Sequence, residues 1–186
     1  MIINEKGYWE TDNSFGHVYD NRLAIALNDF LIKEDAKNIV DFGCGMGDYL
    51  KMFYSNGINC DAFDGNPNTE MLTNGLGKVL DFSCPFDLAK KYNCVLSLEV
   101  GEHIPKKYEQ IFLNNLKNHA ENIIVLSWAV VGQGGSGHVN CQNNDYIIEQ
   151  MSERNFTYDN LNSEYLRTQW SSAPWFEKTI MVFRKK

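Results

Sequence analysis

The chain has 186 residues, of which 44% are hydrophobic and 22% charged, and its formal net charge is −7. That length suits one domain with a substantial buried core, and the composition excludes an intrinsically disordered chain. No cluster of Lys and Arg precedes the Lys185-Lys186 tail. This argues against an extensive nucleic-acid interface, because contacts with phosphates supply most of that affinity.

The cysteines and the absence of targeting patterns indicate the cellular compartment in which the protein is expected. The five cysteines are odd in number and scattered, with no C-x-x-C pair, so neither a disulfide framework nor a zinc site is expected. No signal-peptide pattern and no long apolar run are present, so we expect neither export by that route nor a membrane-spanning segment. A cytoplasmic protein is the simplest expectation.

Residues 1–37 are expected to form an N-terminal cap and helix in front of a core formed by residues 38–186, within one domain. Tyr8 and Trp9 lie in a polar, glycine-containing segment, where we expect them to pack onto the core or to close over a pocket. Apolar residues recur with a helical period in residues 20–33, and Asp20 is a suitable N-cap for that helix.

Strand and helix patterns then alternate along the chain. Strands are expected at residues 38–43, 58–63, 78–80, 93–98 and 122–128, with helices between them at residues 46–56, 67–75, 85–91 and 105–119. This alternation predicts a parallel sheet with right-handed crossovers.

The order of elements changes after residue 128. A glycine-rich loop (129–142) and a helix (143–155) precede two expected strands at residues 156–158 and 179–184, and residues 167–178 between these strands are expected to be irregular. Two closing strands joined by a long connection indicate an antiparallel end to the sheet.

The most informative stretch is the turn after the first predicted strand, where Asp41, Gly43, Gly45 and Gly47 form the pattern D-x-G-x-G-x-G. Glycine lets the backbone bend sharply and approach a ligand closely, and the N-terminus of the following helix faces the same space. A dinucleotide-binding turn would need a third glycine where Asp48 stands. The Asp41 carboxylate would repel a pyrophosphate but suits a cationic, zwitterionic ligand.

This pattern resembles the first motif of the class I S-adenosylmethionine (SAM)-dependent methyltransferases, and the resemblance extends over roughly residues 38–184. It implies a Rossmann-like α/β fold with a mostly parallel seven-stranded sheet, helices on both faces and an antiparallel C-terminal strand. It also implies SAM as the cofactor and S-adenosylhomocysteine (SAH) as the product. A glycine-rich turn without a ligand is the alternative, whereas an NAD-linked oxidoreductase is disfavoured by Asp48.

The resemblance assigns the cofactor's amino-acid end and ribose to four residues near this turn. Gly43 and Gly45 would face the amino-acid end of SAM, and Asp41 would orient its ammonium group. Asp64, which follows the second strand, would accept hydrogen bonds from the ribose hydroxyls; an ordinary Asp-Gly turn is the alternative.

Three further residues complete the implied cofactor site. Asp81 matches the position that receives the adenine amino group, and Phe82 offers an amide and an aromatic edge; Asp81 would otherwise be a helix N-cap. His17 resembles a histidine found near the methionine carboxylate in related enzymes, although a surface histidine fits as well.

Glu99, Glu102 and His103 form the pattern E-x-x-E-H after the strand at residues 93–98, where an acceptor would meet the cofactor. This spacing brings the three side chains to one side if they form a helical turn. Two carboxylates and an imidazole can bind a divalent cation such as Mg²⁺ or Mn²⁺. The pattern resembles the metal-binding segment of small-RNA 2′-O-methyltransferases and of some quinone-pathway O-methyltransferases, in which a later histidine, matched here by His138, completes the site.

The same residues also support catalysis without a metal. A sugar hydroxyl is a poor nucleophile, and His103 or His138, together with Glu102, could take up its proton. Alternatively, Glu102 and His103 only cap the following helix while Glu99 lines the SAM pocket.

The loop at residues 132–140 contains four glycines and is expected to close over an acceptor. Its Gly137-His138-Val139-Asn140 segment resembles a pattern in methyltransferases of glycan-synthesis systems. The resemblance implies O-methylation of a sugar or glycan hydroxyl, for example on a deoxysugar such as rhamnose, or of another small hydroxylated acceptor. An RNA terminus or a small metabolite as acceptor and a non-catalytic SAM-binding domain are the alternatives.

Overall fold

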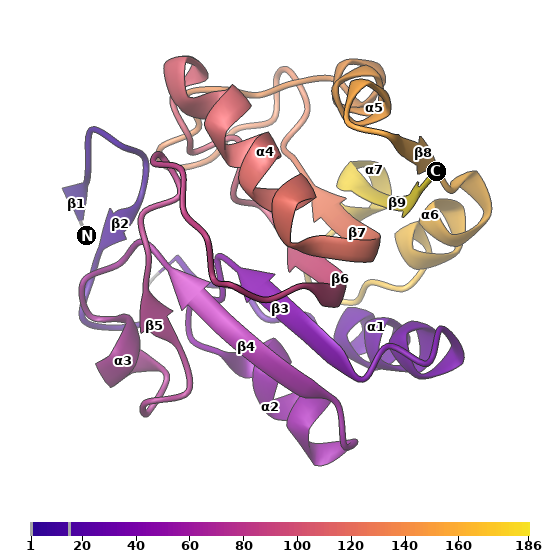
Figure 1. The fold of residues 1–186 in the computed structure, drawn as a ribbon. Coiled ribbons are helices and arrows are strands. Elements are labelled where there is room, and N and C mark those ends of the chain that lie inside the picture. Colours follow the sequence, from indigo (N-terminus) through magenta and orange to yellow (C-terminus); the bar gives the residue numbers. More distant parts are fainter. Residues whose placement is uncertain (1, 15) are drawn as a thin grey trace.

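The computed structural model describes residues 2–14 and 16–186 (Figure 1). Its strands are β1 (Ile2–Ile3), β2 (Trp9–Glu10), β3 (Asn38–Phe42), β4 (Asn59–Asp64), β5 (Lys78–Val79), β6 (Tyr92–Ser97), β7 (Ala120–Ser127), β8 (Phe156–Tyr158) and β9 (Ile180–Lys185). Its helices are α1 (Asn21–Lys33), α2 (Asp48–Ser55), α3 (Thr69–Leu72), the 3₁₀ turn η1 (Lys106–Tyr108), α4 (Glu109–His119), α5 (Asn144–Glu153), α6 (Asn160–Arg167) and α7 (Phe176–Thr179).

Seven strands form one sheet in the order β5-β4-β3-β6-β7-β9-β8. The strands from β5 to β7 pair in parallel, and β9 is antiparallel to both β7 and β8. The predicted mostly parallel sheet with an antiparallel end is therefore confirmed. The strand order reverses between β3 and β6, and ligands of such sheets bind outside the carboxyl ends of the strands at this point.

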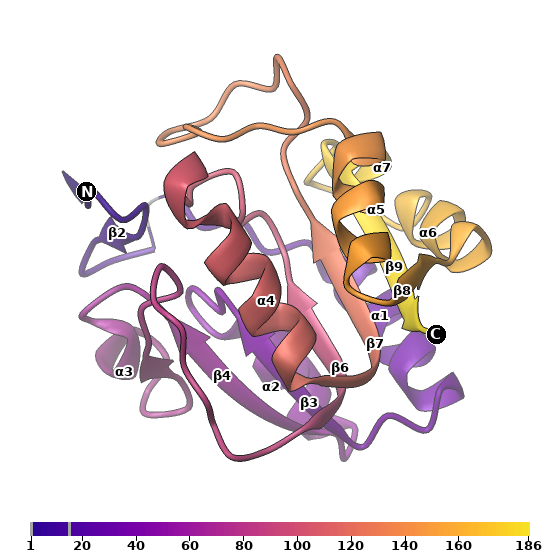
Figure 2. The same cartoon turned by 45° about the horizontal axis from the view of Figure 1, so that its top comes forward.

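Helices cover both faces of the sheet, as Figure 2 shows for α4 and α5 on one side and α1 and α2 behind them. Successive residues of a strand point to opposite faces, so Ile39 packs in a buried cluster with Leu27 of α1 and Phe53 of α2. Its neighbour Val40 packs in a second cluster with Phe112 of α4. The N-terminal helix thus shares the core of the sheet. No helix within residues 2–14 and 16–186 is long and apolar enough to cross a membrane.

One predicted helix is absent, and two short helices were not predicted: α6, and α7 in the segment 167–178 that was expected to be irregular. Residues 85–91 form no helix; this segment is instead irregular and bound to α4, where the Leu88 amide donates a hydrogen bond of 3.1 Å to Nε2 of His119. Residues 160–167, for which no helix was expected, form α6, and the Asp159 side chain caps it by accepting from the Asn162 amide at 3.1 Å.

Candidate active site

A cavity of about 390 Å³ opens at the carboxyl ends of β3, β4 and β6, within the range of about 300–1,000 Å³ typical of small-molecule sites. The β1–β2 hairpin and the loop between β7 and α5 contribute residues to its mouth. Most of the predicted site residues line it: His17, Asp41, Gly43, Gly45, Asp64, Phe82, Glu99, His103 and His138. Asp81 and Glu102 are not among the lining residues.

The glycine turn after β3 has the conformation that its sequence predicts. Gly43 and Gly45 have positive φ angles of 100° and 52°, a region that favours glycine. A Cβ on Gly43 would lie 2.1 Å from Cγ2 of Val100, and one on Gly45 would lie 2.7 Å from Nδ1 of His17. The turn is therefore in close contact with the segment after β6 on one side and with His17 on the other.

Asp41 places a buried carboxyl at the floor of the cavity, with only 4% of the residue exposed. Burial, followed by the charge of Asp64, raises the pKa of Asp41 to about 8. A cationic group bound beside Asp41 would favour its ionised form. The site is thus suited to an ammonium group, as the sequence predicts.

Asp64, at the end of β4, is connected to the glycine turn. Its Oδ2 accepts from the Gly45 amide at 2.9 Å, and its Oδ1 accepts from the Asn66 amide at 2.9 Å. Each carboxylate oxygen has a second lone pair. Asp64 can therefore accept further hydrogen bonds from hydroxyl groups in the cavity.

Asp81 departs from the expected arrangement, whereas Phe82 lines the cavity as predicted. The Asp81 carboxylate forms an ion pair of 2.7 Å with Lys6 of the N-terminal hairpin and accepts hydrogen bonds from the amide and hydroxyl of Ser83. Burial alone would raise the pKa of Asp81, but these partners hold it below its usual value. In this structure Lys6 and Ser83 bind the Asp81 carboxylate, which was predicted to accept a hydrogen bond from the adenine amino group.

Glu99 follows β6 in a strained conformation. Its φ angle is +54°, which is uncommon for a residue with a side chain and occurs preferentially at functional sites. Its amide donates to Oγ of Ser127 at 2.7 Å, and its Oε2 accepts from Nε2 of Gln133 at 3.1 Å. Oε1 is buried and makes no hydrogen bond of good geometry among the described residues, while the carboxyl as a whole lies against Ser127, Thr179 and Glu102.

The E-x-x-E-H segment does not form one helical turn with all its side chains together. Ligand atoms of Glu102, His103 and His138 lie within 4.8 Å of one another. Glu99 is not part of that cluster; its Oε2 accepts from Gln133, and its carboxyl interacts with that of Glu102. Both carboxylate oxygens of Glu102 are buried and lack a hydrogen-bond partner in the described part of the chain. Burial, followed by the charge of Glu99, raises the pKa of Glu102 well above its usual value.

His103 and His138 both bind a backbone carbonyl through the same ring nitrogen. Nδ1 of His103 lies 3.2 Å from the Gly137 carbonyl, and Nδ1 of His138 lies 3.3 Å from the Gln133 carbonyl. A carbonyl can only accept, so each Nδ1 carries a proton, and in the neutral ring this leaves the lone pair on Nε2. Burial lowers the pKa of His103 to about 4, and its imidazole is therefore neutral at physiological pH.

Trp9 of the β1–β2 hairpin lies between the glycine turn and the E-x-x-E-H segment. Its ring centroid lies 5.5 Å from that of His17, which contacts the glycine turn, and 5.3 Å from that of His103. Its Nε1 is buried without a partner among residues 2–14 and 16–186. Tyr8 and Trp9 of the N-terminal segment line the cavity.

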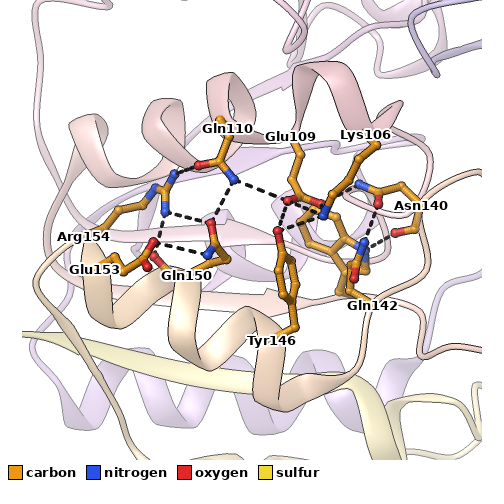
Figure 3. Close-up of polar contacts among 10 residues, drawn as sticks. Lys106, Glu109, Gln110, Asn140, Gln142, Tyr146, Gln150, Glu153 and Arg154 are labelled. Atoms are coloured by element: carbon orange, nitrogen blue, oxygen red, sulfur yellow. Dashed lines mark hydrogen bonds and ion pairs between the residues drawn. The ribbon is translucent and has the colours of Figure 1, made fainter.

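A polar network beneath the loop between β7 and α5 fixes the position of that loop (Figure 3). Glu109 is fully buried, and its carboxylate accepts from Lys106 at 2.8 Å, from Nδ2 of Asn140 at 2.9 Å and from the Tyr146 hydroxyl. Burial alone would raise the pKa of Glu109, but these three donors hold it below its usual value. Glu109 is thus an ionised group that joins α4, the loop and α5.

Asn140 connects the same network to the E-x-x-E-H segment. Its amide donates to the Glu102 carbonyl at 2.9 Å, its carbonyl accepts from Nε1 of Trp128 at 2.6 Å, and its Oδ1 accepts from Gln142 at 2.6 Å. His138 is two residues before Asn140. The network therefore determines where His138 lies relative to Glu102.

A family model described as a methyltransferase domain matches residues 15–127, well over half of the chain. The chain belongs to this methyltransferase family. The protein is thus a SAM-dependent methyltransferase, in agreement with the prediction from the glycine turn. No curated protein matches the chain.

Solved structures of other methyltransferases share the fold. Magnesium protoporphyrin IX methyltransferase from Synechocystis PCC 6803, with bound SAH, superposes with a TM-score of 0.68 at 16% identity over 88% of this chain and 82% of that one. An amino pentose methyltransferase from Micromonospora echinaspora, with bound SAM, gives 0.69 at 12% identity over 88% and 90%. A TehB-like SAM-dependent methyltransferase from Corynebacterium glutamicum gives 0.67 at 15% identity over 89% and 88%.

Sequence reasoning missed three residues of this methyltransferase site: Lys6, Gln133 and Glu109. Lys6 and Gln133 bind carboxylates that are distant in the sequence, and no local pattern signals them. Glu109 had a signal, because it precedes Phe112 and Leu116 at helical spacing on the buried face of α4. A charge at such a position indicates a buried partner.

Proposed function

We propose that this methyltransferase transfers a methyl group to a hydroxyl of a sugar or glycan, with His103 as the general base. The observation that carries this proposal is a neutral His103 imidazole that lines the cavity with its Nδ1 bound to the Gly137 carbonyl. This hydrogen bond leaves Nε2 able to accept a proton. Trp9 and Trp175 also line the cavity and offer flat apolar faces for a sugar ring.

The cofactor residues follow from the geometry of the glycine turn. Asp41 would hold the ammonium group, His17 and the Gly45 turn would lie at the amino-acid end, and Asp64 would accept from the ribose hydroxyls. Phe82 would form the wall beside the adenine. Asp81 could bind the adenine amino group only if its ion pair with Lys6 were broken.

SAM supplies a methyl group that its sulfonium makes electrophilic, and transfer of that group leaves SAH. The acceptor oxygen becomes positively charged as its bond to the methyl carbon forms, so the hydroxyl proton becomes strongly acidic. Even an imidazole of low pKa can then take this proton, and Nε2 of His103 is the atom we assign to it. Nε2 of His138, which lies 3.9 Å from Oε1 of Glu102, offers a second place for the proton.

The residues present also fit a divalent cation. Glu102, His103 and His138 bring one carboxylate and two imidazoles within 4.8 Å of one another, and the Glu102 oxygens have no other partner among the described residues. Mg²⁺ or Mn²⁺ held there would lower the pKa of a hydroxyl that binds to it. We place His103 as the base because a cation would first have to displace the proton that burial favours on Glu102.

An acceptor screen with labelled SAM tests this proposal. The panel would contain methyl rhamnoside, methyl fucoside, methyl glucoside and methyl galactoside, beside short RNA ends and catechol as alternative acceptors. We expect methylation of at least one glycoside and none of RNA or catechol. Transfer to RNA or catechol alone would contradict the sugar assignment, and SAM binding without transfer to any acceptor would indicate a non-catalytic SAM-binding domain.

A further inference from the structure

Carboxyl groups are the most numerous ionisable side chains of the cavity wall. Four carboxyl groups contribute to its wall: Asp41, Asp48, Asp64 and Glu99. Among the described residues that line it, none is a lysine or an arginine. The wall therefore offers an anion no guanidinium or ammonium partner.

The imidazoles of the cavity are already engaged or neutral. Nδ1 of His103 lies 3.2 Å from the Gly137 carbonyl, and Nδ1 of His138 lies 3.3 Å from the Gln133 carbonyl. Burial lowers the pKa of His17, so that ring is neutral at physiological pH.

Two lysines on the adjoining segments are already paired: Lys6 binds Asp81 at 2.7 Å, and Lys106 binds the buried Glu109 at 2.8 Å. Neither can turn toward an acceptor without breaking its ion pair.

Unpaired polar atoms of the cavity wall can form hydrogen bonds with uncharged groups of a ligand. Nε1 of Trp9 and Nε1 of Trp175 are buried donors without a partner in the described part of the chain, and Oε1 of Glu99 is a buried acceptor without one. A buried polar group is costly to leave unpaired, and hydroxyl groups can serve as donor or acceptor to all three. The wall is thus complementary to a neutral, polyhydroxylated ring.

We propose that the methyltransferase selects acceptors whose reacting sugar carries no negative charge, and that it rejects uronic acids and sugar phosphates. This inference rests on the proposed function. A carboxylate or phosphate in the cavity would lose its hydration without gaining a cationic partner. The sulfonium charge of SAM would not compensate for this loss, because it diminishes as the methyl group is transferred.

Matched acceptors test this charge selection. Each neutral glycoside that is methylated in the panel would be compared with its C6 carboxylate or its C1 phosphate, for example methyl glucoside with methyl glucuronide. We expect kcat/KM to be at least tenfold lower for the anionic partner, which corresponds to about 1.4 kcal/mol. Equal or faster methylation of the uronide or phosphate would contradict the selection while leaving sugar methylation intact. A panel in which no glycoside is methylated would instead contradict the proposed function.

A charge introduced at the mouth provides the second measurement. Ser136 lines the cavity from the exposed part of the loop, and Ser136→Arg would supply the missing cation, with Ser136→Gln as the neutral control of similar length. We expect the Arg variant to raise the ratio of anionic to neutral kcat/KM at least fivefold over the Gln variant. An unchanged ratio would show that wall charge does not set the selection.

Discussion

The side-chain amide of Asn140 donates a hydrogen bond of 2.9 Å to the buried carboxylate of Glu109. The Asn140 backbone amide also donates to the Glu102 carbonyl. Asn140 therefore joins α4 to the E-x-x-E-H segment and to the loop that carries His138. Glu109 is not among the residues that line the cavity, so we regard it as a positioning residue for the loop that carries His138.

Replacing this carboxylate should separate positioning from cofactor binding. In Glu109→Gln the Lys106 ammonium loses its charged partner and Tyr146 or Asn140 loses part of its acceptor, so we expect a loss of about 1–3 kcal/mol in the free energy of unfolding. We also expect kcat to fall while the Kd for SAM changes less than about threefold, because the glycine turn is untouched. Chemical denaturation, calorimetry with SAM and methyl-transfer assays measure these effects.

The matched control for Glu109→Gln is Glu153→Gln at the exposed end of the same network, where Glu153 accepts from Gln150 at 3.2 Å. An exposed charge of this kind contributes within about 0.5 kcal/mol. If both variants behave alike in stability and kcat, Glu109 has no positioning role.

Gly45→Ala should weaken cofactor binding. The new Cβ would lie 2.7 Å from Nδ1 of His17 at a φ of +52°, so either the turn or His17 must move away from the cavity. The left-handed conformation alone costs about 1–2 kcal/mol, and together with the displacement we expect the Kd for SAM to rise roughly tenfold or more. Calorimetric titration with SAM measures the change.

Gly57→Ala controls for the backbone strain in Gly45→Ala. Gly57 also has a positive φ, 78°, but a Cβ there would meet no atom within 4 Å. This variant should lose stability while its Kd for SAM stays at the wild-type value. An equal rise of Kd in both variants would mean that the contact with His17 is irrelevant to the cofactor.

Asp41 should release a proton when SAM binds. Its pKa of about 8 in the ligand-free protein keeps the carboxyl largely protonated at pH 6.5, and the SAM ammonium would favour the ionised form. We expect close to one proton to be released at pH 6.5, measured as a dependence of the binding enthalpy on the ionisation enthalpy of the buffer. Asp41→Asn should abolish this dependence and weaken SAM binding.

The same shift makes a prediction about stability. The folded protein holds a proton on Asp41 between pH 4 and about 8, where the unfolded chain does not, so this group makes stability fall as pH rises through that window. Asp41→Asn should therefore unfold at a higher temperature than the ligand-free wild type at pH 8, with a smaller difference at pH 4. A wild-type protein that is more stable than the variant at pH 8 would contradict the raised pKa.

Removal of divalent cations distinguishes the two uses of the Glu102, His103 and His138 cluster. We expect methyl transfer to persist after dialysis against EDTA, because His103 in this account needs no cation. Loss of transfer that Mn²⁺ restores in the wild type, but not in Glu102→Gln, would identify these residues as metal ligands instead.

The sequence was sufficient for features that depend on neighbouring residues. The alternation of strands and helices and the turn from Asp41 to Gly47 were predicted, because each depends on a few consecutive positions. The helix expected at residues 85–91 and the unexpected α6 were errors in short segments, where contacts such as that of Leu88 with His119 decide the conformation.

Contacts between distant segments were beyond sequence reasoning. Lys6 forms an ion pair with Asp81, 75 positions later in the sequence, and Gln133 binds Glu99, 34 positions earlier. Three of the four predicted ligands cluster, and Glu99 does not. The spacing of E-x-x-E-H determines only the order of the side chains along the chain. The direction of the Glu99 side chain depends on its left-handed φ and on its contact with Gln133. No periodicity or motif encodes these choices.

The most direct test of the account is the rate of methyl transfer to a neutral glycoside by His103→Ala, measured with labelled SAM at pH 7.5 beside the Kd for SAM. We predict a fall in kcat of about 10²–10⁴-fold with the Kd within about threefold of the wild-type value. His119→Ala, which removes a histidine outside the cavity lining, should keep a kcat near that of the wild type. A His103→Ala enzyme that transfers methyl groups at the wild-type rate would contradict the assignment of His103 as the base.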